Sequence, residues 1–250
     1  MRQAVAYGVN MEDIIQGAIF GEGVPVAAHS FPSAWANNPD LEPYPFEPET
    51  AMALLDEAGW IDEDGDPTTP RVASEDALYA DPGTELSFLL QVDASDNARV
   101  NASTIIQDQL TDIGFNVEIE GIEFSALIPV LLGQGYDAIM IGWTNINPDT
   151  DSRAQFNPEF DVVGSGFNFV SMNNPEMSQL LEEARTVPGC SVEERAALYY
   201  QAQAIQHEEL PYLFMYANLN VIAVSGDVAA FNPYAENLFH NLGSWAQAIG

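Results

Sequence analysis

In the middle of the sequence, segments with apolar residues at strand spacing alternate with segments at helix spacing, and this succession limits the fold more than any other feature. Apolar and polar residues alternate over residues 86–92 and 115–119, which predicts two strands. Between them, residues 96–113 carry apolar positions at helical spacing, and residues 125–132 predict another helix. Residues 136–143 then form a nearly continuous apolar run, which predicts a third strand buried on both faces.

The succession strand, helix, strand, helix, strand predicts an α/β fold with a mainly parallel sheet flanked by helices, because parallel neighbours need right-handed crossovers. Pro129 falls near the start of the second crossover helix. We expect it within the first turn, where a missing N–H costs little.

Capping residues predict three further helices. One runs from Pro48, a residue suited to the first helical position, to the stop at Gly59. A second begins at Asn174, followed by proline, and a third begins with Ser191 and Glu194 arranged as a capping box.

The remaining segments are less regular. Residues 1–20 predict two short helices, and residues 21–46 a loop rich in proline and glycine. The acidic stretch 62–66 has proline where a calcium-binding EF-hand needs glycine, so we interpret it as a turn. One or two strands are expected within 212–225, followed by an irregular tail.

Charge excludes several classes of function. The formal net charge is -32, and arginine supplies all six basic residues. Such a chain repels nucleic acid and anionic membranes. Because salt screens self-repulsion, the composition indicates a salt-loving source, with an ordinary acidic surface protein as the alternative.

Other sequence features restrict the chemistry. Cys190 is the only cysteine, so an internal disulfide is excluded, and no metal or cofactor is expected. No stretch reaches the roughly 18 apolar residues of a membrane span. The first residues read as the middle of a helix, so we expect the chain to be cut from a longer one.

The loop after the third predicted strand is the candidate binding site, because α/β sheets bind ligands beyond the carboxyl ends of their strands. Trp143 offers a flat face there, and the segment continues with Thr144, Asn145, Ile146 and Asn147. An equally weighted alternative is that Trp143 packs in the core and the rest is an ordinary turn.

Enzymatic motifs are missing. His29, His207 and His240 are far apart in sequence, and His207 is expected on a solvated helix face. No metalloprotease motif, nucleophile elbow or phosphate loop occurs. We therefore predict a protein that is not an enzyme; a hydrolase or transferase using unpaired carboxylates at the same site is the weaker alternative.

Several collinear segments resemble the family 5 solute-binding proteins of ABC importers. They are Arg2 to Tyr7, Ile14 to Gly17, Phe31-Pro32, Pro48 to Trp60, Tyr136 to Trp143, Asn174 to Glu176, Leu180 to Arg185, Glu194 to Tyr199 and Leu210 to Tyr212. No single segment is decisive, but their order is specific. The resemblance implies a lobe of the class II periplasmic-binding-protein type, with residues 1–225 as the C-terminal lobe and residues 226–250 returning toward a missing N-terminal lobe.

The resemblance also implies partners and location. Such a receptor closes like a hinge on a small oligomeric solute and delivers it to an ABC permease in the membrane. It would be extracytoplasmic, in the periplasm or on the cell surface, and lipid-anchored through the missing N-terminus. Phe31 and Trp35 in the proline-rich loop join Trp143 and residues 144–147 as candidate ligand contacts.

The resemblance leaves the solute open. Peptide-binding members often place an aspartate three residues after the tryptophan, where it pairs with the ligand's amino terminus. This sequence has Ile146 there, which favours an oligosaccharide unless Asp149 or Asp151 substitutes. A sensory receptor with the same lobe is a further alternative to transport.

Overall fold

The computed structural model of the chain describes residues 1–143, 150–233 and 239–247. Its contacts divide the chain into two compact units, Met1–Ala217 and Asn218–Gly250. This division falls earlier than the boundary at residue 225 expected from the sequence, and the assignment of the two parts to lobes stays a prediction.

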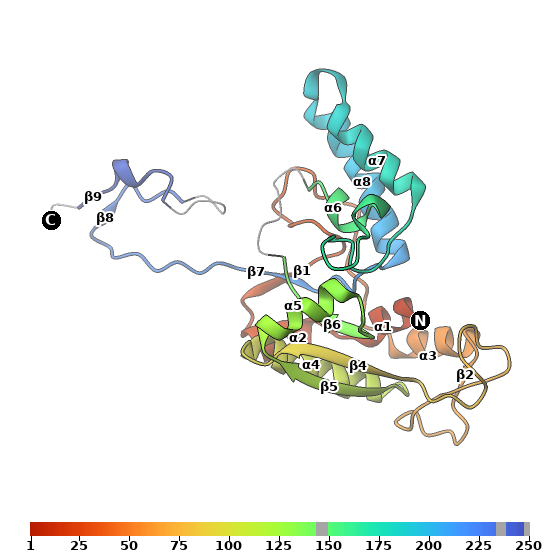
Figure 1. Cartoon of the computed structure of the whole chain (residues 1–250). Coiled ribbons are helices and arrows are strands. Elements are labelled where there is room, and N and C mark those ends of the chain that lie inside the picture. Colours follow the sequence, from red (N-terminus) through yellow and green to blue (C-terminus); the bar gives the residue numbers. More distant parts are fainter. Residues whose placement is uncertain (144–149, 234–238, 248–250) are drawn as a thin grey trace. The chain divides into compact units, whose positions relative to one another are not determined.

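Unit 1 is built around a parallel sheet of β4 (Ser87–Asp93), β5 (Asn116–Ile122) and β6 (Ala138–Met140). The strand order is β5-β4-β6 (Figure 1). Leu90 of the central strand is in register with Ile119 on one side and Ala138 on the other. The predicted α/β fold with a parallel sheet is therefore confirmed.

The two crossover helices are α4 (Asn97–Thr111) and α5 (Phe124–Gly133). The first crossover leads from β4 to β5, and the second returns past β4 to β6. Because right-handed crossovers in opposite directions place their helices on opposite faces, α4 and α5 sandwich the sheet. The second crossover thus runs opposite to the first, and β6 lies on the other side of β4 from β5.

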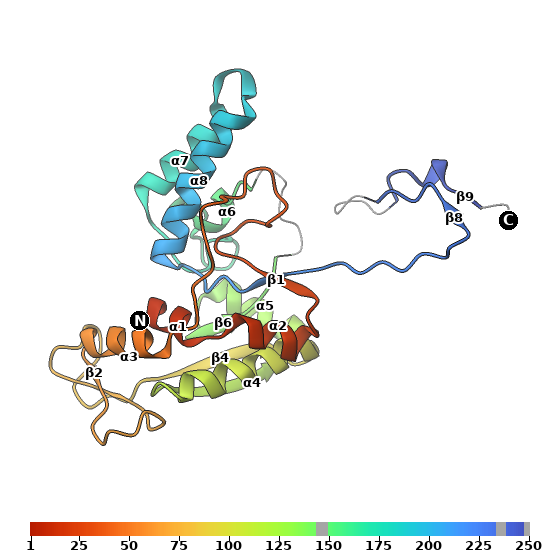
Figure 2. The same cartoon turned by 180° about the vertical axis from the view of Figure 1, so that it is seen from behind.

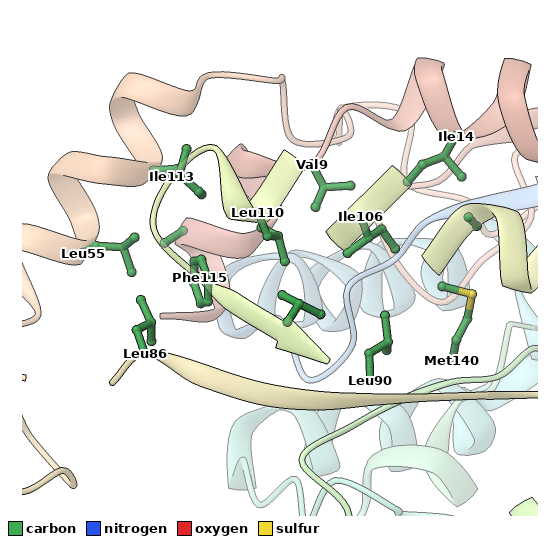
Figure 3. Packing of buried hydrophobic residues seen from close by; sticks show 14 of the residues in the cluster. Val9, Ile14, Leu55, Leu86, Leu90, Ile106, Leu110, Ile113, Phe115 and Met140 are labelled. Atoms are coloured by element: carbon green, nitrogen blue, oxygen red, sulfur yellow. The ribbon is translucent and has the colours of Figure 1, made fainter. Parts of the chain in front are cut away.

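One apolar core fills the space between the sheet and four helices. Helices α1 (Arg2–Gly8), α2 (Met11–Ile19) and α3 (Pro48–Glu57) join α4 on this face. Figure 3 shows Leu90 and Met140 from neighbouring strands directed toward Ile106 of α4. Burial of such side chains contributes about 1.5–3 kcal/mol each, so this core holds the sheet in place.

A second apolar cluster lies around a helical hairpin. Helices α7 (Pro175–Thr186) and α8 (Val192–Glu209) lie side by side (Figures 1 and 2), and α6 (Arg153–Phe156) adds Phe156. The Asn174 and Ser191 side chains accept the backbone N–H groups of Met177 and Glu194. Both predicted N-caps are thus confirmed.

A surface excursion follows α3. Its short strands β2 (Trp60–Ile61) and β3 (Val72–Ala73) pair antiparallel. The acidic segment between them forms a turn, in which the Asp62 carboxylate accepts the N–H of Gly65. The prediction of a turn is confirmed there.

The remaining elements are short. Strand β1 (Gly23–Pro25) pairs with β7 (Tyr216–Asn218), which ends at the boundary of unit 1, and single turns of 3₁₀ helix occur in unit 1 at η1 (Pro158–Phe160) and η2 (Pro188–Cys190). Unit 2 contains β8 (Val228–Ala229), η3 (Leu242–Ser244) and β9 (Ala246–Gln247), with β8 and β9 antiparallel. No helix in the described ranges has the length and apolar character required to cross a bilayer.

Three sequence predictions were wrong in detail. Pro129 is the sixth residue of α5, inside the helix, because α5 begins at Phe124. Strand β6 spans three residues at an edge of the described sheet, and Ala138 and Ile139 stay partly exposed. His207 is only half-exposed, since its ring stacks on Tyr44 at 4.5 Å.

Candidate functional site

The candidate site lies at the carboxyl edge of the sheet, where the neighbouring strands β4 and β6 end. The central strand β4 ends there at Asp93, and Gly142 and Trp143 follow the neighbouring strand β6. Open α/β sheets bind ligands beyond the carboxyl ends of their parallel strands, so this edge is the candidate site.

Two acidic residues and one arginine follow the end of β4. The carboxylate of Asp93 accepts the backbone N–H and the hydroxyl of Ser95 at 3.0 and 2.8 Å through the same oxygen, Oδ1. Asp96 caps α4 by accepting the N–H of Arg99. The Arg99 side chain returns to Asp96, with 3.3 Å between Nε and Oδ2.

The Arg99 guanidinium also packs against the loop after β6. A Cβ atom at Gly142 would lie 3.2 Å from the terminal nitrogen Nη2 of Arg99. Glycine at this position therefore lets the loop that carries Trp143 approach α4 closely. The ends of β4 and β6 are joined in this way into one surface.

Trp143 is partly exposed and belongs to a cluster of aromatic rings. Its ring stacks on Phe169, with 5.8 Å between centroids and 5° between planes. Phe167 and His29 meet it edge to face at 5.9 and 6.1 Å. Phe167 is 48% exposed, so it extends the aromatic surface of Trp143 toward solvent.

The inner side of this cluster is buried. His29 also packs edge to face on Phe156, and burial lowers its pKa to about 4, so the imidazole is neutral at pH 7. Burial also raises the pKa of Tyr212, an effect that the nearby Trp143 indole partly offsets. Trp143 thus packs on one side against neutral, ordered side chains and is open to solvent on the other.

Buried amides fix the loops beneath the cluster. Gln206 of α8 accepts the backbone N–H of His29 at 3.1 Å and donates to the hydroxyl of Ser152 at 2.8 Å. Asn168 is fully buried, and its amide bonds the backbone of Asn157 and Met172. The aromatic surface is therefore pre-organised, which lowers the entropic cost of binding.

The candidate ligand contacts predicted from the sequence lie in different parts of the chain. Trp143 is at the carboxyl edge, while Thr144, Asn145, Ile146 and Asn147 lie outside the described residues. Phe31 is partly buried in the loop before α3. Trp35 packs on α8, with its ring 6.0 Å from Tyr199 and 5.2 Å from the Arg195 guanidinium. Contact of these residues with a ligand stays a prediction.

Of the two aspartates considered as partners for a ligand amine, Asp149 lies outside the described residues. Asp151 already has partners within the fold. It accepts the backbone N–H of Arg153, and its second oxygen lies 3.6 Å from Nε of Arg185. A free carboxylate is therefore not available at Asp151.

Sequence reasoning missed Asp93, His29, Phe167 and Phe169. The only sequence signal for Asp93 was its position at the end of a predicted strand, and the three aromatic residues lie in loops without periodicity. Across the described residues, no group of three or more His, Cys, Asp and Glu side chains is arranged to hold a metal ion.

Comparisons with known proteins agree with this architecture. The family "Bacterial extracellular solute-binding proteins, family 5 Middle" matches residues 1–157. The oligopeptide-binding protein AppA of Bacillus subtilis is 24% identical over 98% of the chain, and the dipeptide-binding protein of Escherichia coli is 29% identical over 97%. The chain covers 43% and 42% of these two proteins, so it spans less than half of their length.

A solved structure has a similar fold. The structure of AppA from Bacillus subtilis in complex with a nonapeptide superimposes with a TM-score of 0.81 at 23% sequence identity, covering 99% of the chain and 47% of AppA. This similarity supports the fold assignment.

Proposed function

Because the chain belongs to the bacterial extracellular solute-binding proteins of family 5, we propose that it forms part of the capture component of an ABC importer. Its ligands are peptides or similar oligomers. The observation that carries this proposal is the partly exposed Trp143, stacked on Phe169 at the carboxyl edge of the parallel sheet, because α/β sheets bind ligands at that edge. The protein acts by binding and release, and an ABC permease in the membrane receives the solute.

The aromatic surface of Trp143 and Phe167 forms one wall of the binding site. A second wall comes from another lobe of the full-length receptor, because the relatives are more than twice as long as the matched region. Closure of the two lobes buries the solute against the ordered aromatic cluster. The loop 144–147, with Phe31 and Trp35, completes the proposed contacts.

Peptides are the favoured solute, since the two curated relatives are named for oligopeptide and dipeptide binding. An oligosaccharide is the alternative supported by this chain, because Ile146 replaces an expected aspartate and flat aromatic rings also stack on sugars. We place the protein outside the cytoplasm, anchored by lipid. The excess of acidic residues supports a salt-loving source.

The test uses the full-length receptor in molar KCl. Di- to nonapeptides and neutral oligosaccharides are screened by thermal unfolding, followed by calorimetry on each positive. A ligand at about a hundred times its Kd stabilises the folded state by about 2.7 kcal/mol, which gives a clear shift. The Trp143→Ala variant should lose most of this ligand-induced stabilisation. If no peptide or oligosaccharide raises the unfolding temperature of the wild type, the proposed function is contradicted.

A further inference from the structure

Phe167 combines exposure to solvent with a fixed place in an aromatic cluster. The residue is 48% exposed, yet its ring centroid lies 5.9 Å from that of Trp143 and 6.1 Å from that of Phe169. The other exposed phenylalanines of unit 1 have no aromatic neighbour in the described part of the chain; they are Phe20, Phe46 and Phe124. Exposed apolar surface that continues an ordered aromatic cluster indicates a contact with a ligand, whereas a lone exposed residue does not.

The three rings form a triangle that leaves Trp143 accessible. Trp143 and Phe169 are parallel, and Phe167 is inclined to them by 79° and 83°. The centroid distances are nearly equal, at 5.8, 5.9 and 6.1 Å, so Phe167 lies beside both rings. If Phe167 lay across Trp143 from Phe169, its distance to Phe169 would be nearly twice as long. Phe167 and Trp143 therefore meet at nearly a right angle, and both reach solvent.

The backbone on both sides of Phe167 is fixed. Asn168, the next residue, is fully buried, and the hydroxyl of Tyr136 donates to the carbonyl of Phe169 at 2.8 Å. On the other side, a Cβ atom at Gly166 would collide with a backbone carbonyl, so only glycine fits there. An apolar side chain on such a backbone loses little freedom when a ligand binds.

The described part of this surface offers few partners to a sugar, whose hydroxyls need hydrogen bonds when they lose water. Of the rings that contact Trp143, those of Phe167 and Phe169 carry no polar atom, and that of His29 is buried. The buried amide beneath them, that of Asn168, is already hydrogen-bonded within the fold. The surface therefore favours an apolar group of the solute.

We propose that Phe167 determines specificity by binding an aromatic side chain of the solute in the angle between its own ring and Trp143. This inference rests on the proposed function and narrows its solute to peptides that carry an aromatic residue. An aromatic ring is the group that such an angle fits best, because it can stack on one ring and meet the other edge to face. These contacts add to the gain from burying the apolar area of the side chain.

The probes are tetrapeptides, measured by calorimetry on the full-length receptor in molar KCl. Tetra-alanine is compared with four peptides that carry one phenylalanine each, at positions one to four, and with their four leucine counterparts. Competition against the tightest peptide extends the measurement to weak ligands. Maltotetraose serves as the neutral sugar. The aromatic preference is the Kd of tetra-alanine divided by the Kd of the tightest phenylalanine peptide.

The variants are Phe167→Ala and Phe167→Leu, and Phe46→Ala is the control. Phe46 is a match because it is 44% exposed and lies outside the aromatic cluster. We expect an aromatic preference of about tenfold in the wild type and in Phe46→Ala, and a smaller preference for leucine. Phe167→Ala should reduce the aromatic preference to below about threefold while the Kd of tetra-alanine stays nearly unchanged, and Phe167→Leu should give an intermediate value. The unfolding temperature of each variant without ligand shows whether it is folded.

Several results would overturn the inference. They are an aromatic preference that persists in both Phe167 variants, equal weakening of tetra-alanine and the phenylalanine peptides, and leucine peptides that bind as tightly as phenylalanine peptides. Binding of maltotetraose without any peptide would also remove this role of Phe167, and in all these cases the receptor function stands. Failure of every peptide and sugar to bind would overturn the proposed function as well.

Discussion

Replacing Arg71 should destabilise unit 1 far more than replacing its ion-pair partner Asp56. The Arg71 side chain is 4% exposed, whereas that of Asp56 is 63% exposed. The Arg71 guanidinium also donates to the backbone carbonyls of Trp60 and Ile113 at 2.9 and 3.2 Å. Both residues are buried, so these carbonyls depend on Arg71 for a partner.

The magnitudes follow from this difference in exposure. A largely exposed ion pair contributes about 0–1 kcal/mol, so Asp56→Asn should lower the free energy of unfolding by less than about 1 kcal/mol. Arg71→Met keeps an unbranched stem over Gly114 but leaves two buried carbonyls unsatisfied, at about 1–3 kcal/mol each. The expected loss for Arg71→Met is therefore about 2–6 kcal/mol.

Urea unfolding at low and at molar KCl measures both variants, with unchanged m-values as the check on two-state behaviour. The Asp56→Asn loss should disappear in molar salt, because salt screens exposed charges. The Arg71→Met loss should persist, because carbonyl hydrogen bonds are not screened. Equal losses in the two variants, or an Arg71→Met loss that vanishes with salt, would refute this reasoning.

Three further predictions concern the site and the charge of the protein. Trp143→Ala should weaken solute binding in calorimetry by about 1–3 kcal/mol, whereas an unchanged Kd would assign Trp143 to the core. Moving the protein from molar salt to dilute buffer should abolish cooperative thermal unfolding, and equal stability in both would contradict the salt-loving interpretation. Because the pKa of His29 falls to about 4, stability should be full above about pH 6.5 and drop toward pH 4, by about 3 kcal/mol at about 1.4 kcal/mol per pKa unit. Urea unfolding of wild type and His29→Phe across this range isolates that contribution, and parallel pH profiles would disprove it.

Local signals in the sequence predicted most elements of unit 1. Helices α7 and α8 are capped by Asn174 and Ser191, whose side chains accept otherwise unpaired N–H groups of the first turn in any tertiary context. Strand β4 was predicted because its alternating apolar face must be buried. The position of Pro129 within its helix was predicted wrongly. The start of α5 has no capping side chain, and such helix ends have weak sequence signals.

The arrangement of the site could not be predicted in the same way. Sequence gives the succession of strands, but tertiary packing decides that β6 lies beside β4 and not beyond β5. That choice puts Asp93 and Trp143 on adjacent strand ends. The burial of His29 likewise depends on Gln206, which is distant in sequence, so no local pattern around His29 indicates it.

The acidic surface and the aromatic cluster around Trp143 act over different distances. In molar salt the Debye length is about 3 Å, so most of the -32 charge is not felt by an approaching solute and cannot select it. Discrimination must then come from groups in direct contact with the ligand, where water and ions are excluded. The aromatic surface of Trp143 and Phe167 is the candidate for such contact. Solute binding at this surface should therefore change little with salt, while the stability of the same protein changes strongly.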